Sequence, residues 1–274
     1  MCPVAGRLIG AAHPVRICCH VLVVETDGGV VLVDTGFGTA DVADPRRLPR
    51  ALRAITRPVL DASETAVARV TALGLAPRDV RAIVCTHLDL DHAGGLGDFP
   101  DAEVHVMTDE HQGATSRSTF LERHRYLPAQ LAHGPRWVLH RASGESWRGF
   151  DAARALGPAF GAEVLLVPLG GHTRGHAGVA VRHADGWVLH AGDAYFHHAE
   201  LEPDPKVPIG LSAYQRLIAF DDSLRRANQE RLRMLANDPA STDLRVISAH
   251  DPEELERAQA AGFSATPGAS LGVD

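Results

Sequence analysis

The sequence predicts an α/β protein built as one unit of two β-sheets with helices on their outer sides. Apolar, strand-like segments precede helix-like segments once in each half of the chain, and no low-complexity linker or fixed-period repeat separates the halves. A chain of 274 residues is also long enough to bury one large core. We therefore expect a single domain over residues 1–274.

Composition narrows the classes of function. Hydrophobic residues make up 45% of the chain and charged residues 22%, as in ordinary soluble globular proteins. The formal net charge of −7 argues against a general nucleic-acid binder, because attraction to phosphate needs a basic surface. No apolar run approaches the roughly 20 residues of a membrane-spanning helix, and the first residues show no secretory signal. We expect a cytoplasmic protein without nucleic-acid or membrane partners.

The four cysteines are Cys2, Cys18, Cys19 and Cys85. They show no paired CxxC spacing, and the last three lie in apolar segments that predict strands. We expect buried, reduced thiols in place of a disulfide framework or a zinc knuckle.

The first half of the chain opens with a hairpin. Residues 17–33 predict two strands joined by an Asp-Gly-Gly turn, a combination typical of hairpins. Residues 61–73 predict a helix with apolar side chains on one side and a capping box of Asp61 and Glu64 at its start. The segment VRAIVCT and then residues 103–107 predict two further strands.

Residues from about 108 to 161 are predicted to be less regular, since glycine and proline are scattered through them. Because predicted strands anchor both ends, we expect this segment to project over a cleft and to set the choice of substrate. It carries more arginines than acids, which favours an anionic substrate, with a solvated surface as the alternative. Among these arginines are Arg117, Arg123, Arg125, Arg136, Arg141 and Arg148.

Strands and helices alternate again in the second half. The segments EVLLVP, GVAVRH, WVLHAGD and LRVISAH predict strands, and residues 212–235 predict one long helix. A last helix is expected after Asp251, which can cap it, with Pro252 at its first position. The order of the strands in the sheets does not follow from these patterns.

Polar clusters follow four of the predicted strands. They are THLDLDHAGG, GGHTRGH, AGDAY and SAHD, at residues 86–95, 170–176, 191–195 and 248–251. Ligands of open α/β sheets bind beyond the carboxyl ends of strands, so these clusters can converge on one point. Imidazole and carboxylate are good ligands for zinc, iron or manganese, and two adjacent divalent ions need about six or seven ligands. The clusters supply that number.

Together these segments resemble the motifs of the metallo-β-lactamase superfamily. THLDLDHAGG resembles its HxHxDH motif, GGHTRGH its GHTxGH element, AGD the segment with a bridging aspartate, and SAHD the segment with the last histidine. VDTGFG, at residues 33–38, is similar to an early turn below the metal site. The resemblance implies an αββα four-layer sandwich, with the metals at one edge between its two halves.

The resemblance also implies the ligands. A first ion would be held by His87, Asp89 and His172, a second by Asp91, His92 and His250, and Asp193 would bridge both. Asp89 departs from the commonest pattern, which has histidine there, and its harder carboxylate makes iron or manganese alternatives to zinc. We expect two divalent ions, with zinc as the first choice.

The implied chemistry is hydrolysis of a small-molecule substrate. A hydroxide shared by the metals would attack a carbonyl carbon, and Asp91 would pass the proton to the leaving oxygen. Tyr195 is expected to donate to the oxyanion, with a packed core tyrosine as the alternative. Asp34 is expected to support the site by hydrogen bonds, and His176 to orient the predicted ligand His172 without binding metal.

Our first choice of substrate is a lactone or similar carboxylic ester, by analogy with the lactonase-type branch of the superfamily. Hydrolysis of a thioester, of the glyoxalase II kind, is the second. Phosphodiester hydrolysis, a biosynthetic cyclase or dehydratase, and a non-hydrolytic iron oxygenase use the same scaffold and stay open. The sequence also leaves a homodimer open.

Overall fold

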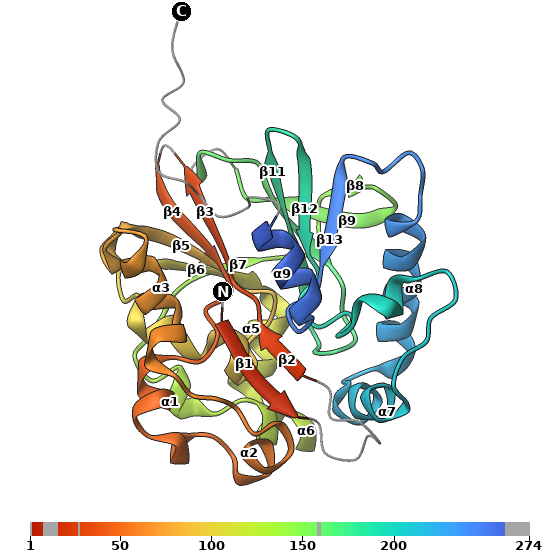
Figure 1. Ribbon diagram of the computed structural model, residues 1–274. Helices are drawn as coiled ribbons and strands as arrows, with labels where there is room; N and C mark the ends of the chain where they lie inside the picture. The colour runs from red at the N-terminus through yellow and green to blue at the C-terminus, as the bar shows by residue number, and fades with distance from the viewer. Residues whose placement is uncertain (1, 8–15, 27, 158–159, 261–274) are drawn as a thin grey trace, which may run out of the picture.

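The computed structural model describes residues 2–7, 16–26, 28–157 and 160–260, and it shows two β-sheets packed face to face between helices (Figure 1). The first sheet has the strand order β3-β4-β5-β6-β7. Strands β3 and β4 are antiparallel and form the expected hairpin, whereas the remaining pairs are parallel. The strands of this sheet are β3 (Leu22–Thr26), β4 (Gly29–Val33), β5 (Val80–Val84), β6 (Glu103–Met107) and β7 (Arg136–His140).

The second sheet has the strand order β13-β12-β11-β10-β9-β8. Neighbours are antiparallel except β12 and β13, which are parallel. Its strands are β8 (Glu145–Trp147), β9 (Phe150–Ala155), β10 (Val164–Pro168), β11 (Ala177–His183), β12 (Gly186–His190) and β13 (Leu244–Ile247). A separate antiparallel pair joins β1 (Cys2–Arg7) to β2 (Arg16–Cys19).

Alternating side chains of the strands build the layers. In β4, Val31 and Val33 pack in a cluster with Leu166 and Val179 of the second sheet, while Leu32 faces the other way. Successive side chains of a strand point to opposite faces, so one face of this sheet meets the second sheet and the other meets helices. This arrangement produces a core between the sheets.

Helices cover both outer faces. Val70 of α3 packs with Leu32 on the first sheet, and Leu232 of α8 packs with Leu189 on the second. The αββα sandwich implied by the resemblance is confirmed. The helices are α1 (Thr39–Ala43), α2 (Arg50–Thr56), α3 (Ala66–Ala72), α4 (Leu90–Ala93), α5 (Thr108–Ser116), α6 (Phe120–Arg125), α7 (Ile209–Ile218), α8 (Asp222–Ala236) and α9 (Pro252–Ala260).

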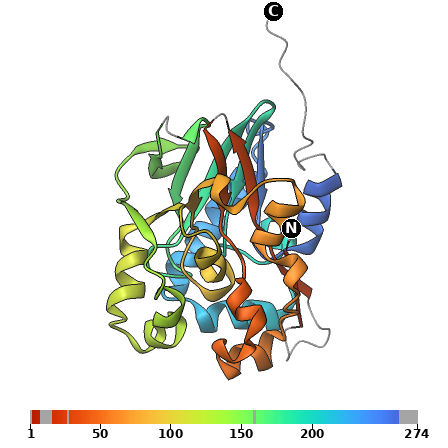
Figure 2. The same cartoon turned by 90° about the vertical axis from the view of Figure 1, so that its left-hand side faces the viewer.

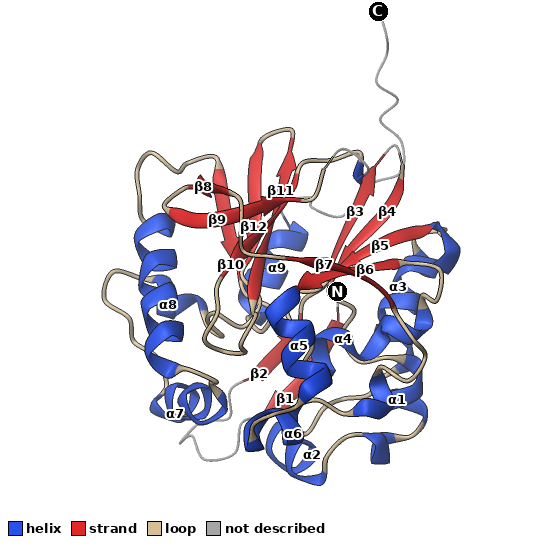
Figure 3. Ribbon diagram, turned by 180° about the vertical axis from the view of Figure 1, so that it is seen from behind, coloured by secondary structure: helices blue, strands red, loops and turns tan. Residues whose placement is uncertain are grey.

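Two further views show how the layers are arranged. Turned by 90°, the strands of both sheets run through the upper part of the molecule, with the early helices below them (Figure 2). Seen from behind, α7 and α8 lie on one side and α1, α2 and α3 on the other, with the sheets between them (Figure 3). Within the part of the chain that the structure describes, no helix has both the length and the apolar character needed to cross a membrane.

The first of the two strands predicted within residues 17–33 is divided in the structure. The N–H groups of Cys18 and His20 donate to the carbonyl groups of His250 and Ala249, at 3.2 and 2.8 Å. This pairing takes β2 out of the sheet that contains β3. Apolar periodicity cannot predict the division, because the partners lie at the far end of the chain.

Two helix predictions also need correction. Helix α3 does not start at Asp61: that residue caps a short 3-10 turn through Ser63, and Thr65 caps the helix itself. The single helix predicted over residues 212–235 is two helices, α7 and α8, because the N–H groups of residues 220 and 221 donate to the loop of residues 171–172. In contrast, Asp251 caps α9 as expected.

The prediction that residues 108–161 form an irregular segment is wrong. This segment forms α5, α6, β7, β8 and β9, so it contributes strands to both sheets. The cause of the error is the composition of α5: nearly all its side chains are polar, so it shows no apolar stripe of helical period.

Candidate metal centre

The four polar clusters converge at one edge of the sandwich, each at the carboxyl end of a strand. The first follows β5 and continues into α4, for which Asp89 is the N-cap residue. The others follow β10, β12 and β13. The seven predicted ligands are brought together, and five of them are almost fully buried: His87, His92, His172, Asp193 and His250.

One group of side chains surrounds the first predicted ion position. The Nε2 atom of His172 lies 3.1 Å from Oδ2 of Asp89 and 3.3 Å from Oδ2 of Asp193. The Nε2 atom of His87 lies 3.5 Å from the same Asp89 oxygen and 3.8 Å from the same Asp193 oxygen. Four possible ligand atoms therefore face one point.

A second group surrounds the other position. The Nε2 atoms of His92 and His250 each lie 3.1 Å from Oδ1 of Asp193. Asp91 completes the group, with Oδ2 3.7 Å from Nε2 of His250 and Oδ1 3.9 Å from Nε2 of His92. Asp193 thus presents one carboxylate oxygen to His87 and the other to His92, which is the geometry of a bridging ligand.

Several buried atoms of these two groups lack a hydrogen-bond partner. The Nε2 atoms of His87 and His92 and Oδ1 of Asp193 are buried and have no hydrogen-bond partner among the described residues. Leaving such polar atoms desolvated is costly unless a bound ion satisfies them. Burial disfavours a charged His92, yet Asp193 and Asp91 raise its pKa well above the usual value. The carboxylates therefore favour positive charge at this position, as a divalent metal would provide.

Hydrogen bonds behind the ligands hold their Nε2 atoms toward the centre. Asp34, as expected, accepts from the backbone and hydroxyl of Thr86 at 2.8 Å each and contacts Nδ1 of His92 at 2.9 Å. Nδ1 of His250 lies 2.7 Å from the carbonyl oxygen of Cys18. Partners of this kind fix the tautomer and the orientation of a metal-binding imidazole.

His176 supports a predicted ligand without joining the cluster itself, as expected, but this ligand is Asp193 and not His172. Its Nδ1 atom lies 3.0 Å from the carbonyl of Leu169, and its Nε2 accepts a hydrogen bond of 2.9 Å from the backbone N–H of Asp193. It therefore positions Asp193, the predicted bridging residue. Sequence reasoning placed it beside His172.

Glu110 of α5 is a supporting residue that sequence reasoning missed. Its carboxylate is fully buried and accepts from the backbone N–H of Leu88 at 2.9 Å and from that of Gly175 at 3.1 Å. It also accepts from the hydroxyl groups of Thr173, at 2.6 Å, and Tyr126, at 2.9 Å. One carboxylate therefore joins the loop of His87 to the loop of His172.

Arg125 is a second residue whose role was missed. It is buried, its Nε lies 3.4 Å from Oδ1 of Asp89, and its Nη1 donates to the carbonyl of His172 at 2.7 Å. It also donates to the carbonyl of Ile218. The guanidinium is therefore engaged within the protein. Of the other predicted arginines, Arg136 and Arg148 pair with surface acids.

The structure does not bring Tyr195 into the cluster. Its side chain is fully buried, and its hydroxyl donates to both carboxylate oxygens of Glu254 at 2.9 and 3.0 Å. Tyr195 is therefore a packed core tyrosine, which was the alternative prediction for this residue. A different tyrosine, Tyr214, packs on Phe196 with ring centroids 6.3 Å apart, and the Phe196 ring lies 4.5 Å from that of His250. Burial, followed by the charges of Asp91 and Asp193, raises the pKa of Tyr214. No motif in the sequence singles out this residue of α7.

The chain belongs to the metallo-beta-lactamase superfamily, and the model of this family matches residues 19–250. This span includes all seven predicted ligand residues. Membership of the family implies binding of divalent metal, in agreement with the donor atoms described above.

Particular relatives narrow the class further. The chain is 45% identical to a probable metallo-hydrolase of Mycobacterium tuberculosis, over 90% of this chain and 79% of that protein. It is 28% identical to the N-acyl homoserine lactonase AttM of Azorhizobium caulinodans, over 82% of this chain and 78% of that protein. A solved structure of an N-acyl homoserine lactone hydrolase, with the product N-hexanoyl-L-homoserine at its catalytic metal centre, matches at a TM-score of 0.69 and 20% identity over 93% of each chain. The protein is a metallo-hydrolase.

Proposed function

We propose that this metallo-hydrolase opens a lactone or a similar carboxylic ester at a binuclear metal site, with zinc as the first choice of metal. The observation that carries the proposal is the position of Asp193, whose two oxygens face two separate groups of histidines and aspartates. The lactonase named among its relatives supports the substrate class.

The seven converging side chains would hold the two ions in the sets implied by the resemblance. Ions held in this way supply a nucleophile from water at neutral pH and polarise the carbonyl oxygen of a substrate. Burial, together with the nearby charge of Arg125, lowers the pKa of His172 to about 4. This imidazole is therefore neutral at neutral pH and offers its lone pair, as a metal ligand must.

Asp91 is the proposed carrier of the proton. Its side chain is 24% exposed, against 16% for Asp89 and 4% for Asp193, so it is the cluster carboxylate most open to substrate. We assign it the transfer of a proton from the attacking water to the leaving oxygen. Tyr214 packs on Phe196, whose ring centroid lies 4.5 Å from that of His250, so its phenol is the nearby hydroxyl that we assign the donor role first expected of Tyr195.

The test combines metal analysis with a substrate screen. Protein purified without added metal and without chelator is analysed for zinc, iron and manganese, and is then assayed on matched lactones, thioesters, phosphodiesters and β-lactams. We expect two ions per chain and turnover of lactones above all other classes. Preferential turnover of thioesters would instead indicate a thioester hydrolase, the second candidate function. Activity that survives complete metal removal would contradict the mechanism.

A further inference from the structure

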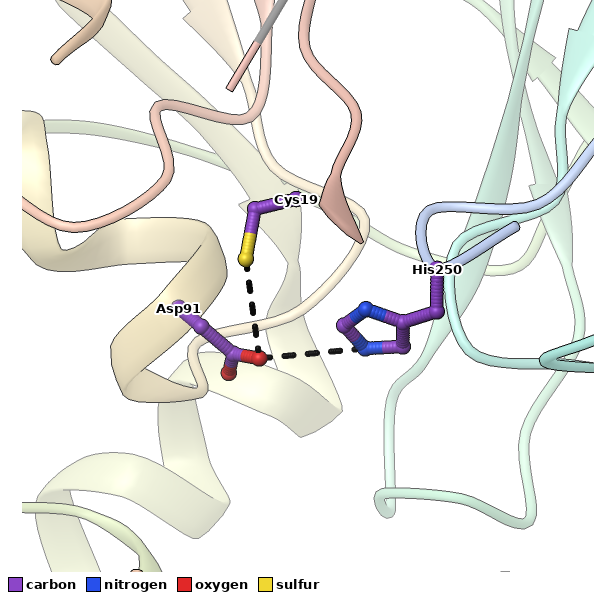
Figure 4. A group of neighbouring side chains, drawn as sticks. All are labelled: Cys19, Asp91 and His250. Atoms are coloured by element: carbon purple, nitrogen blue, oxygen red, sulfur yellow. Dashed lines mark hydrogen bonds and ion pairs between the residues drawn. The ribbon is translucent and has the colours of Figure 1, made fainter. Parts of the chain in front are cut away.

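We propose that Cys19, from the N-terminal strand β2, is a further ligand of the second ion, so that this position is built for zinc. The inference rests on the proposed binuclear site and adds a sulfur ligand to it. Neither the motifs nor the family resemblance includes this residue. Figure 4 shows the juxtaposition: Cys19, Asp91 and His250 come from three separate segments and point toward one another.

The distances fit a shared ion. The Sγ atom of Cys19 lies 3.9 Å from Oδ2 of Asp91, which lies 3.7 Å from Nε2 of His250, and the ligand atoms of all three residues lie within 4.8 Å of one another. Bond lengths of about 2.3 Å from zinc to sulfur and about 2.1 Å to oxygen place neighbouring ligand atoms of a five-coordinate ion about 3.1 to 3.8 Å apart. The thiol is a weak donor and makes a long hydrogen bond to this oxygen of Asp91.

The backbone holds Cys19 in this place. Its neighbours on both sides, Cys18 and His20, donate to the carbonyl groups of His250 and Ala249, and Nδ1 of His250 contacts the carbonyl of Cys18. Successive side chains of a strand point to opposite sides. Accordingly, the thiol of Cys18 contacts the carbonyl of Ala249, whereas that of Cys19 reaches Asp91. A ligand histidine and the proposed sulfur ligand are thus fixed to each other.

Unsatisfied atoms of other residues face the same position. Nε2 of His92 and Oδ1 of Asp193 belong to side chains that are 1% and 3% exposed, and neither has a hydrogen-bond partner among the described residues. Both atoms belong to the second group. Cys19 is itself 3% exposed and packs with Phe37, Leu48 and Leu90, so the sulfur lies on an apolar, water-poor side of the centre.

A thiolate would make the two ion positions chemically different. On binding, the thiol proton leaves to solvent and a sulfur–metal bond forms, with no change of oxidation state. Thiolate selects zinc over manganese and magnesium, whereas carboxylate suits the harder metals. The second position would therefore prefer zinc even where Asp89, at the first, admits iron or manganese.

The decisive experiment is X-ray absorption at the zinc edge on the wild-type protein loaded with two zinc ions. We expect one sulfur scatterer at about 2.3 Å from one of the two ions. The cobalt-substituted protein should also show a thiolate-to-cobalt charge-transfer band in the near ultraviolet. Cys19→Ser should abolish this band and weaken binding of the second ion at least about ten-fold. Cys18→Ser is the matched control and should keep both the band and the affinity.

The possible results separate this inference from the function proposed above. Two bound zinc ions without a sulfur scatterer, or a charge-transfer band that survives in Cys19→Ser, would overturn the role of Cys19 and leave the binuclear hydrolase intact. Fewer than two ions in the wild-type protein would contradict both proposals. If Cys19→Ser does not fold, the wild-type absorption spectrum decides alone, because it needs no variant.

Discussion

Arg125 compensates the charge of Asp89, the residue that departs from the usual ligand pattern. The guanidinium Nε lies 3.4 Å from the carboxylate, and the two side chains are 8% and 16% exposed. Burial alone would raise the pKa of Asp89, yet Arg125 leads the charges that hold it well below the usual value. An anionic ligand paired with a fixed cation adds less net negative charge than a carboxylate alone. The pair therefore reduces the preference for iron or manganese that Asp89 by itself would produce.

The first prediction concerns this pair. Asp89→His alone should lose about 3 kcal/mol of folding stability, because it leaves Arg125 buried without its anion. Asp89→His combined with Arg125→Met should recover most of that loss and move the metal preference toward zinc. Denaturant unfolding at fixed metal concentration and metal competition check the two parts. Additive losses in the double variant would show that the residues are not coupled.

The second prediction tests the bridge. Asp193→Ala should lower bound metal at both positions and abolish most activity, since this carboxylate faces both groups. Metal content by elemental analysis and lactone turnover are the measurements. Asp185→Ala, in an exposed turn, is the control and should change neither. A fully metallated and active Asp193→Ala would remove Asp193 from the ligand set.

The third prediction separates the two tyrosines. Tyr214→Phe should lower kcat about 100-fold with metal content unchanged, as expected for loss of a donor to developing charge. Tyr195→Phe should leave kcat unchanged and cost about 1 kcal/mol of stability, because its hydroxyl serves Glu254. Paired kinetics and unfolding measurements check both. The opposite result, with kcat sensitive to Tyr195 only, would return that residue to the mechanism.

The fourth prediction follows from Glu254. Burial raises the pKa of this carboxyl from 4.5 to about 7, so the folded state binds its proton more tightly than the unfolded state does. Its contribution to stability is therefore complete below pH 4.5 and is lost as the pH rises to about 7. Glu254→Gln should remove this loss, which amounts to about 3 kcal/mol across the window. Unfolding free energies of both proteins from pH 4 to 9 should diverge in that window and run parallel above it.

The ligand motifs were predictable because each is local. His87, Asp91 and His92 lie within one short segment after a buried strand, and that segment alone indicates metal chemistry. Cys19 and Arg125 carry no such signal, since their partners lie far away in the chain: Cys19 and Asp91 are 72 positions apart. The role of Tyr195 was misjudged for the same reason, because its partner Glu254 is 59 positions away.

The same distinction holds for the fold. The hairpin of β3 and β4 depends on a turn between β-branched runs, so its sequence predicts it. Helix α5 escaped prediction because it is held by buried polar contacts of Glu110 and not by an apolar stripe. Hydrophobic periodicity detects only helices that carry an apolar stripe.

Glu110 also limits which substitutions this enzyme can accept when its substrate specificity changes. Four donors converge on its carboxylate, and Gln would replace one acceptor oxygen with a donor group facing donors. Asp, shorter by one methylene, would not reach all of them. We therefore expect changes of substrate preference to arise at positions other than Glu110. Libraries designed to alter specificity should leave this interior residue fixed.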